Sequence, residues 1–263
     1  MTKRKRSDTR KSGRGRAQRC EPLMTGSGVA EARCVLCGIN AATTREHVPP
    51  ESFFERPYPD NLITVPACAD CNQGSQGDDE YLLAYLVGLD HPGTPSVLES
   101  VRNRVYRALR RPERPGLHIR LLEASTLVRS GVGTEQQRLT VESRPDGERM
   151  IRVVRKQVRG LAFHLTDRIL PRSTYVGLER TFFTHTRPPE YWDHWLKGGE
   201  YAMSGRTGER GDVFRYGYRE IERSACVAAM RLEYYRVFAY TALIFRPDFS
   251  PPQRVRFPFS RVT

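Results

Sequence analysis

Two Cys-x-x-Cys pairs constrain the fold of this chain more than any other feature of its sequence. The first pair is Cys34 and Cys37, and the second is Cys68 and Cys71. A Cys-x-x-Cys turn lets two thiolates reach one ion, and two such turns complete the tetrahedral ligand set of a structural zinc. Four of the six cysteines are paired in this way, which suits metal binding in a reducing compartment better than a disulfide framework. We therefore predict a closed zinc site at these four thiolates, in a cytoplasmic protein.

The segment between the two pairs is longer and more polar than a structural zinc site requires. It runs from residue 38 to 67, whereas simple zinc ribbons have about 15–20 residues there. It carries Glu46, His47 and Asn61, and Asn72 directly follows the last cysteine. Hydrolysis of a phosphodiester needs a base such as neutral imidazole and a cation that prefers oxygen ligands. These side chains therefore suggest a second, catalytic site whose geometry the zinc site stabilises.

Residues 30–85 resemble the HNH endonuclease family in its four-cysteine form, whose core is a ββα-metal motif. The matches occur in order: Cys-x-x-Cys-Gly, an acid–histidine pair, Asn-Leu, and a second Cys-x-x-Cys followed by asparagine. The resemblance implies that His47 is the general base and that Glu46 and Asn72 hold a catalytic Mg²⁺ or Mn²⁺. It makes Asn61 the residue that fixes the loop carrying His47. It also implies hydrolysis of double-stranded DNA to 3′-hydroxyl and 5′-phosphate ends.

The chain departs from the family pattern at three positions. Glu46 stands where aspartate is commoner, and Asn72 stands where many members have histidine. The lysine often found three residues after Asn72 is Ser75 here. These changes bear on the choice of metal and on turnover more than on the fold.

The net charge of the chain bears on its partners. At +13 over 263 residues it favours a polyanion such as nucleic acid, with an acidic membrane surface as the competing partner. No apolar run approaches the ~20 residues of a spanning helix, and no signal-peptide core is present, so we expect no membrane partner. Charge does not distinguish DNA from RNA. An RNA-directed nuclease and a non-catalytic, zinc-stabilised DNA-binding or regulatory protein therefore stay open as alternatives.

Three regions are expected along the chain. Residues 1–28 are a basic tail with nine Lys or Arg and one acid in the first 19 positions, which predicts disorder. The tail would act as an electrostatic arm or be merely solvated. Residues 29–90 form the HNH module, and residues 91–263 form an α+β domain with antiparallel strands and unknown function. The predicted fold class is thus α+β, in which a zinc-stabilised ββα-metal module precedes the α+β domain.

Hydrophobic periodicity predicts the secondary structure after the zinc region. Helices are expected at 78–87, 95–110 and 151–165, and strands at 117–121, 139–141, 175–183, 213–220 and, as an adjacent pair, within 226–245. The last helix has a basic face that we expect to be solvated or to rest on phosphates, formed by Arg152, Arg155, Lys156 and Arg159. Aromatic residues of the late strands are expected in a sheet core rather than in a base-stacking platform: Tyr216, Tyr218, Tyr234, Tyr235, Phe238, Tyr240 and Phe245.

Overall fold

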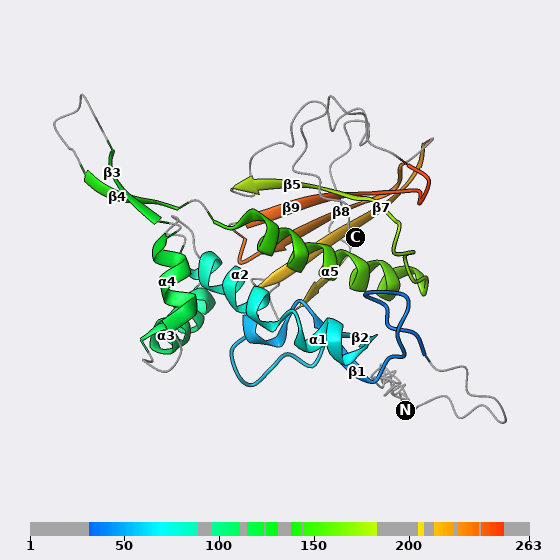
Figure 1. Cartoon of the computed structure of the whole chain (residues 1–263), viewed down its shortest axis with the longest axis horizontal. Coiled ribbons are helices and arrows are strands. Elements are labelled where there is room, and N and C mark those ends of the chain that lie inside the picture. The colour runs from blue at the N-terminus through cyan, green and yellow to red at the C-terminus, as the bar shows by residue number, and fades with distance from the viewer. Residues whose placement is uncertain are drawn as a thin grey trace, which may run out of the picture. The chain divides into compact units, whose positions relative to one another are not determined.

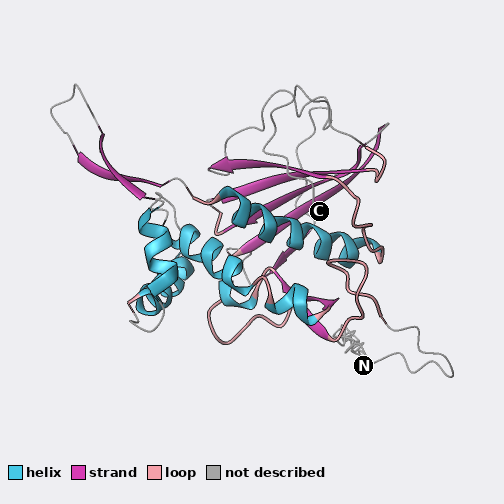
Figure 2. Ribbon diagram, viewed as in Figure 1, coloured by secondary structure: helices cyan, strands magenta, loops and turns pink. Residues whose placement is uncertain are grey.

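The computed structural model mixes helices with antiparallel sheets, which confirms the coarse fold class (Figures 1 and 2). It describes residues 32–88, 96–110, 115–123, 125–130, 138–143, 145–182, 205–207, 213–223, 226–236 and 238–249. The predicted basic tail lies outside the described residues. The helices are α1 (Ala69–Gln73), α2 (Gln76–Gly88), α3 (Ser96–Leu109), α4 (Pro115–Glu123), α5 (Gly147–Thr166) and the 3-10 helix η1 (Glu51–Phe53). The strands are β1 (Thr44–Val48), β2 (Ile63–Ala67), β3 (Ser125–Ser130), β4 (Arg138–Ser143), β5 (Val176–Phe182), β6 (Gly205–Thr207), β7 (Phe214–Arg223), β8 (Cys226–Tyr234) and β9 (Phe238–Phe245).

The zinc region folds as a hairpin followed by helices. Strands β1 and β2 pair antiparallel, with Glu46 opposite Val65 and His47 opposite Thr64. Burial alternates along β2, as expected for a strand with one face in the core. Helix α1 begins directly after the second strand, at Ala69, and α2 follows it. The order strand, strand, helix is the order that the sequence predicts, whereas membership of the HNH family stays a prediction.

The second half of the chain forms a five-stranded antiparallel sheet in the order β5-β9-β8-β7-β6. The predicted strand pair is confirmed as the hairpin β8–β9. The connection between the strands includes Tyr235 and Arg236, both at positive φ (50° and 58°), a conformation that tight hairpin connections often require. The aromatic side chains expected in the sheet core are buried, except that Tyr218 is only partly buried.

Helix α5 is confirmed and extends further than its periodicity predicts. The carboxylate of Asp146, directly before the helix, caps it by accepting hydrogen bonds from the backbone N–H groups of Glu148 and Arg149. Tyr234 of β8 donates a 2.7 Å hydrogen bond to the side-chain oxygen of Gln157, so one side of α5 faces the large sheet. In Figure 1 the helix lies between that sheet and the β1–β2 hairpin.

The prediction of a solvated basic face on α5 is wrong for three of its four residues. Arg155, Lys156 and Arg159 are buried, and only Arg152 is exposed. Arg159 donates to the backbone oxygens of residues 170, 171 and 172, and Lys156 pairs with acids of the hairpin region. The helix is packed on two sides, and Lys156 and Arg159 are buried where groups outside the helix accept their hydrogen bonds.

Helix α4 contradicts the strand predicted at residues 117–121. Leu117 and Leu121 are partly buried against the core, whereas Ile119 is 49% exposed. Over five residues, alternating leucines also satisfy the four-residue spacing of one helix face, so the pattern alone did not separate the two structures. Pro115 at the first helical position favours the helix.

Gly160 permits close packing of α5 on the hairpin. A Cβ atom at this position would lie 2.6 Å from Cγ2 of Val48. We expect Gly160→Ala to lower the free energy of unfolding by about 1 kcal/mol, because overpacking costs about 1–3 kcal/mol and helix propensity returns at most about 1. Urea unfolding measures the change. Gly147→Ala, in the same helix with no atom within 4 Å, is the control and should be neutral or stabilising; equal losses in both variants would contradict the packing argument.

One hydrophobic core joins described residues on both sides of the predicted domain boundary at residue 90. It includes Val48 and Val65 of the hairpin, Val154 of α5 and Tyr234 of the sheet. The division of the chain at residue 90 stays a prediction. Among the described helices, none has the length and apolar character needed to cross a membrane.

Candidate metal centre and adjoining cleft

The first Cys-x-x-Cys turn is shaped by its glycine and docked on the hairpin. Gly38 has φ +71°, which glycine adopts without strain, and its N–H donates a 2.7 Å hydrogen bond to the carbonyl of Cys34. Val35 donates a 2.9 Å backbone hydrogen bond to Pro66 of β2. These bonds hold the first cysteine pair against the strand that leads into the second pair.

The four paired cysteines come together and could hold a metal ion. The sulfur atoms of Cys34, Cys37, Cys68 and Cys71 all lie within 4.8 Å of one another. A tetrahedral zinc with bonds of about 2.3 Å separates its sulfur ligands by about 3.8 Å, so a small adjustment closes the site. Within the described part of the chain, no other group of three or more His, Cys, Asp or Glu residues is arranged in this way.

The electrostatics of the cluster suit a cation. Burial raises the pKa of Cys71, and the neighbouring thiols raise it further. Burial acts in the same direction on Cys37, but backbone hydrogen bonds from residues 40 and 39 bring the pKa of this thiol down to about 7. Four thiolates packed this closely repel one another, so a bound dication would stabilise the ionised set.

A cleft of about 360 Å³ lies beside the cysteine cluster and contains three of the four predicted catalytic residues. Glu46 and His47 come from β1 and Asn72 from α1, the helix that also carries Cys71. The cleft is lined by Arg45, Glu46, His47, Pro50, Glu51, Ser52, Asn72, Gln76, Asp79 and Glu80. The fourth predicted residue, Asn61, is exposed in the turn before β2 and does not line this cleft.

Neighbouring positions on β1 give Glu46 and His47 different environments. Successive strand residues point to opposite faces, so Glu46 is buried, at 4% exposure, and His47 is only partly buried. The Asn72 side chain fastens α1 to the same strand, because its Nδ2 donates to Thr44 Oγ1 at 3.1 Å and to the Arg45 carbonyl at 3.0 Å. The Oδ1 atom of Asn72 accepts no hydrogen bond from the described residues, so it is available to a ligand.

A buried lysine that sequence reasoning did not place in the site contacts Glu46. The ammonium of Lys156, from α5, lies 2.9 Å from Glu46 Oε1 and 2.6 Å from Asp79 Oδ2, and donates to Ser75 Oγ at 2.7 Å. All three charged side chains are less than 10% exposed. In the sequence, Asp79 looks like an ordinary acid in the first turn of α2. Lys156 looks like one residue of a solvated helix face. No local signal in the sequence identifies either as part of a buried cluster.

The cluster holds two carboxylates and one ammonium. Burial raises the pKa of Glu46, and Lys156 opposes that rise. Burial also raises the pKa of Asp79, to about 6, with Lys156 opposing and the Glu46 charge adding to the rise. With both acids ionised, the cluster carries one unmatched negative charge at the floor of the cleft, which favours a cation there.

Comparison with known protein families, with curated proteins and with solved structures finds no match to this chain.

Proposed function

We propose that this protein is a metal-dependent nuclease of the HNH type that hydrolyses phosphodiester bonds in DNA. The observation that carries the proposal is the cleft in which His47 lies beside Glu46 and Asn72, next to four clustered cysteines. The motifs quoted above predict these residues together, and the cleft contains them together. The net charge of +13 supports a polyanionic substrate.

The residues of the cleft fit a weakly held divalent cation. Lys156 occupies Oε1 of Glu46, which leaves the other carboxylate oxygen and Oδ1 of Asn72 as oxygen ligands. Mg²⁺ accepts so few protein ligands because it keeps several waters. When bound, the cation would stabilise negative charge on the leaving oxygen. His47 would take a proton from the attacking water. At the cysteines, zinc would contribute no chemistry and would hold the hairpin and α1 in place.

Lys156 gives this proposal a specific feature. The resemblance would place a lysine at the position of Ser75, and the hydroxyl of Ser75 instead accepts a hydrogen bond from Lys156. An ammonium supplied by α5 thus lies beside the position where the family pattern often has one. We propose that it orients Glu46 and takes the place of that lysine.

His47→Ala tests the proposal directly. We expect it to lower the rate of plasmid nicking with Mg²⁺ or Mn²⁺ by at least about 100-fold, because general-base catalysis contributes about 10²–10⁴-fold. His164→Ala is the matched control, since His164 is exposed on α5 and does not line the candidate catalytic cleft. Nicking that persists in purified His47→Ala would remove this imidazole from the role of base.

One observation favours a second function, a non-catalytic zinc-stabilised protein that binds nucleic acid. Lys156 already compensates much of the charge of Glu46, so the fold does not depend on a catalytic cation. Tight DNA binding with no nicking in either metal would support this function. Cleavage of a sequence-matched RNA but not of the DNA would instead support the RNA-directed nuclease.

A further inference from the structure

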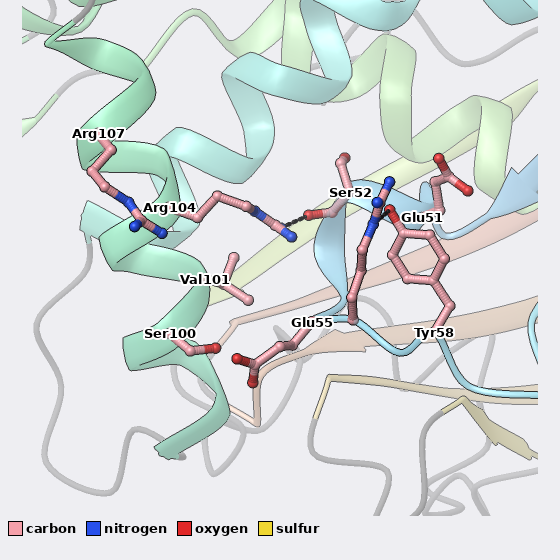
Figure 3. Close-up of a pocket in the computed structure, with 9 residues that line it drawn as sticks. Glu51, Ser52, Glu55, Tyr58, Ser100, Val101, Arg104 and Arg107 are labelled. Carbon is pink, nitrogen blue, oxygen red and sulfur yellow. Dashed lines mark hydrogen bonds between the residues drawn. The ribbon is translucent and has the colours of Figure 1, made fainter.

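A second cleft, of about 480 Å³, lies next to the candidate catalytic cleft (Figure 3). One wall is the segment from η1 to Tyr58, and the other is α3. The two clefts share Glu51 and Ser52, so they adjoin each other at η1. The second cleft is lined by Glu51, Ser52, Glu55, Arg56, Tyr58, Ser100, Val101, Arg104 and Arg107.

Three guanidinium groups line this cleft outside ion-pair distance of any described carboxylate, although the charge of Glu51 acts on Arg56. Among the described residues, no carboxylate forms an ion pair with Arg56, Arg104 or Arg107. Arg104 donates to the backbone carbonyls of Ser52 and Phe54, which secures η1 against α3 but leaves its charge uncancelled. Figure 3 shows Arg104 and Arg107 projecting from α3 on the same side of the cleft.

Arg56 and Tyr58 form a flat, charged surface on the opposite wall. Nε of Arg56 donates a 3.3 Å hydrogen bond to the Tyr58 hydroxyl, and its guanidinium carbon lies 5.2 Å from the centre of the Tyr58 ring. Guanidinium groups bind phosphate through paired N–H donors, and contact with an aromatic ring helps to hold a guanidinium in place. Tyr58 therefore orients the Arg56 guanidinium for a phosphate group.

We propose that this second cleft binds the sugar–phosphate backbone of the nucleic acid next to the bond that is cleaved. Arg56 and Arg107 contact phosphate oxygens from opposite walls, Arg104 adds positive potential without a direct contact, and Tyr58 holds the Arg56 guanidinium in place. The inference rests on the proposed function and names the part of the substrate that the second cleft holds. Glu55, on the same surface, opposes phosphate binding and limits its strength.

Binding of a short duplex DNA to full-length protein tests this inference. All proteins carry His47→Ala, so that the DNA stays intact, and fluorescence anisotropy is measured over a range of NaCl concentrations. Arg56→Gln and Arg107→Gln should each weaken binding and reduce the slope of log K against log salt by about 0.9, the value for one lost phosphate contact. Glu55→Gln should change affinity in the opposite direction. Arg246→Gln is the control, an exposed arginine that lines neither cleft.

The outcomes separate this inference from the nuclease assignment. Suppose that affinity and salt slope are unchanged in both arginine variants, while the protein that retains His47 cleaves plasmid. That result would overturn the inference about the second cleft and leave the nuclease assignment standing. If the salt slopes of the arginine variants are reduced but the protein that retains His47 does not cleave plasmid, the second cleft remains a nucleic-acid site and the nuclease assignment is overturned. Absence of DNA and RNA binding by every protein would overturn both.

Discussion

We expect Cys71→Ser to abolish metal binding at the four-cysteine cluster, for which we propose a structural zinc, and to unfold the β1–β2 hairpin. The hairpin strands have five residues each, and α1 is equally short, so apart from its contacts with α5 and the shared core this region has few stabilising interactions of its own. A structural zinc contributes about 10–16 kcal/mol of apparent binding free energy in zinc-finger peptides. Loss of one thiolate should remove most of that stabilisation from the two strands.

Metal content and hydrogen exchange together measure this effect. The parent protein should retain about one zinc per chain after dialysis against EDTA, as for a closed four-thiolate site, and Cys71→Ser should retain none. Amide exchange should accelerate in β1 and β2 while the central strand β8 stays protected. Cys226→Ser is the control, because Cys226 is a buried free thiol outside the cluster. Zinc retained by Cys71→Ser, or unchanged exchange in the hairpin, would contradict a structural metal site.

Lys156→Met will destabilise the fold by about 3–5 kcal/mol, which is the usual cost of breaking a buried ion pair from one side. The substitution removes the only ammonium that contacts Glu46 and Asp79 among the described residues and leaves both carboxylates in the core. Methionine has a similar length, so the loss reflects uncompensated charge rather than a cavity. Arg152→Met is the matched control. It lies one turn earlier on α5 and pairs with Asp78, but its side chain is 56% exposed, and such pairs contribute at most about 1 kcal/mol.

The pH dependence distinguishes lost charge compensation from general damage. A carboxyl whose pKa is raised by folding destabilises the folded state as pH rises through that pKa, and Asp79 has a pKa raised to about 6. Lys156→Met removes the opposing ammonium, so its deficit should be largest at neutral pH and shrink as acidification protonates Asp79 and Glu46. The triple variant with Glu46→Gln and Asp79→Asn should recover part of the loss at neutral pH. A deficit independent of pH, or no larger than that of Arg152→Met, would refute the buried cluster.

Part of the candidate site was predictable because it is local in sequence. Cysteine spacing predicts a metal cluster since a short turn brings each pair together, and the sulfur positions agree with this. Glu46, His47 and Asn72 adjoin elements that the cysteines bring together, so their shared cleft follows from the same spacing. Asn61 lies in the turn before β2, seven residues before Cys68, and it does not line the cleft.

The sequence by itself determined the cysteine cluster, the long amphipathic helix and the strand pair at the end of the chain, because turn chemistry and hydrophobic periodicity act over short distances. Only the tertiary structure decided that α5 packs against the hairpin as well as the sheet, and that Lys156 reaches a carboxylate 110 residues away. A basic residue on a helix has the same local pattern whether it is solvated or buried. For Lys156, what decides between the two is the pair of carboxylates that β1 and α2 provide, since burying a charge is costly unless an opposite charge or hydrogen bonds compensate it.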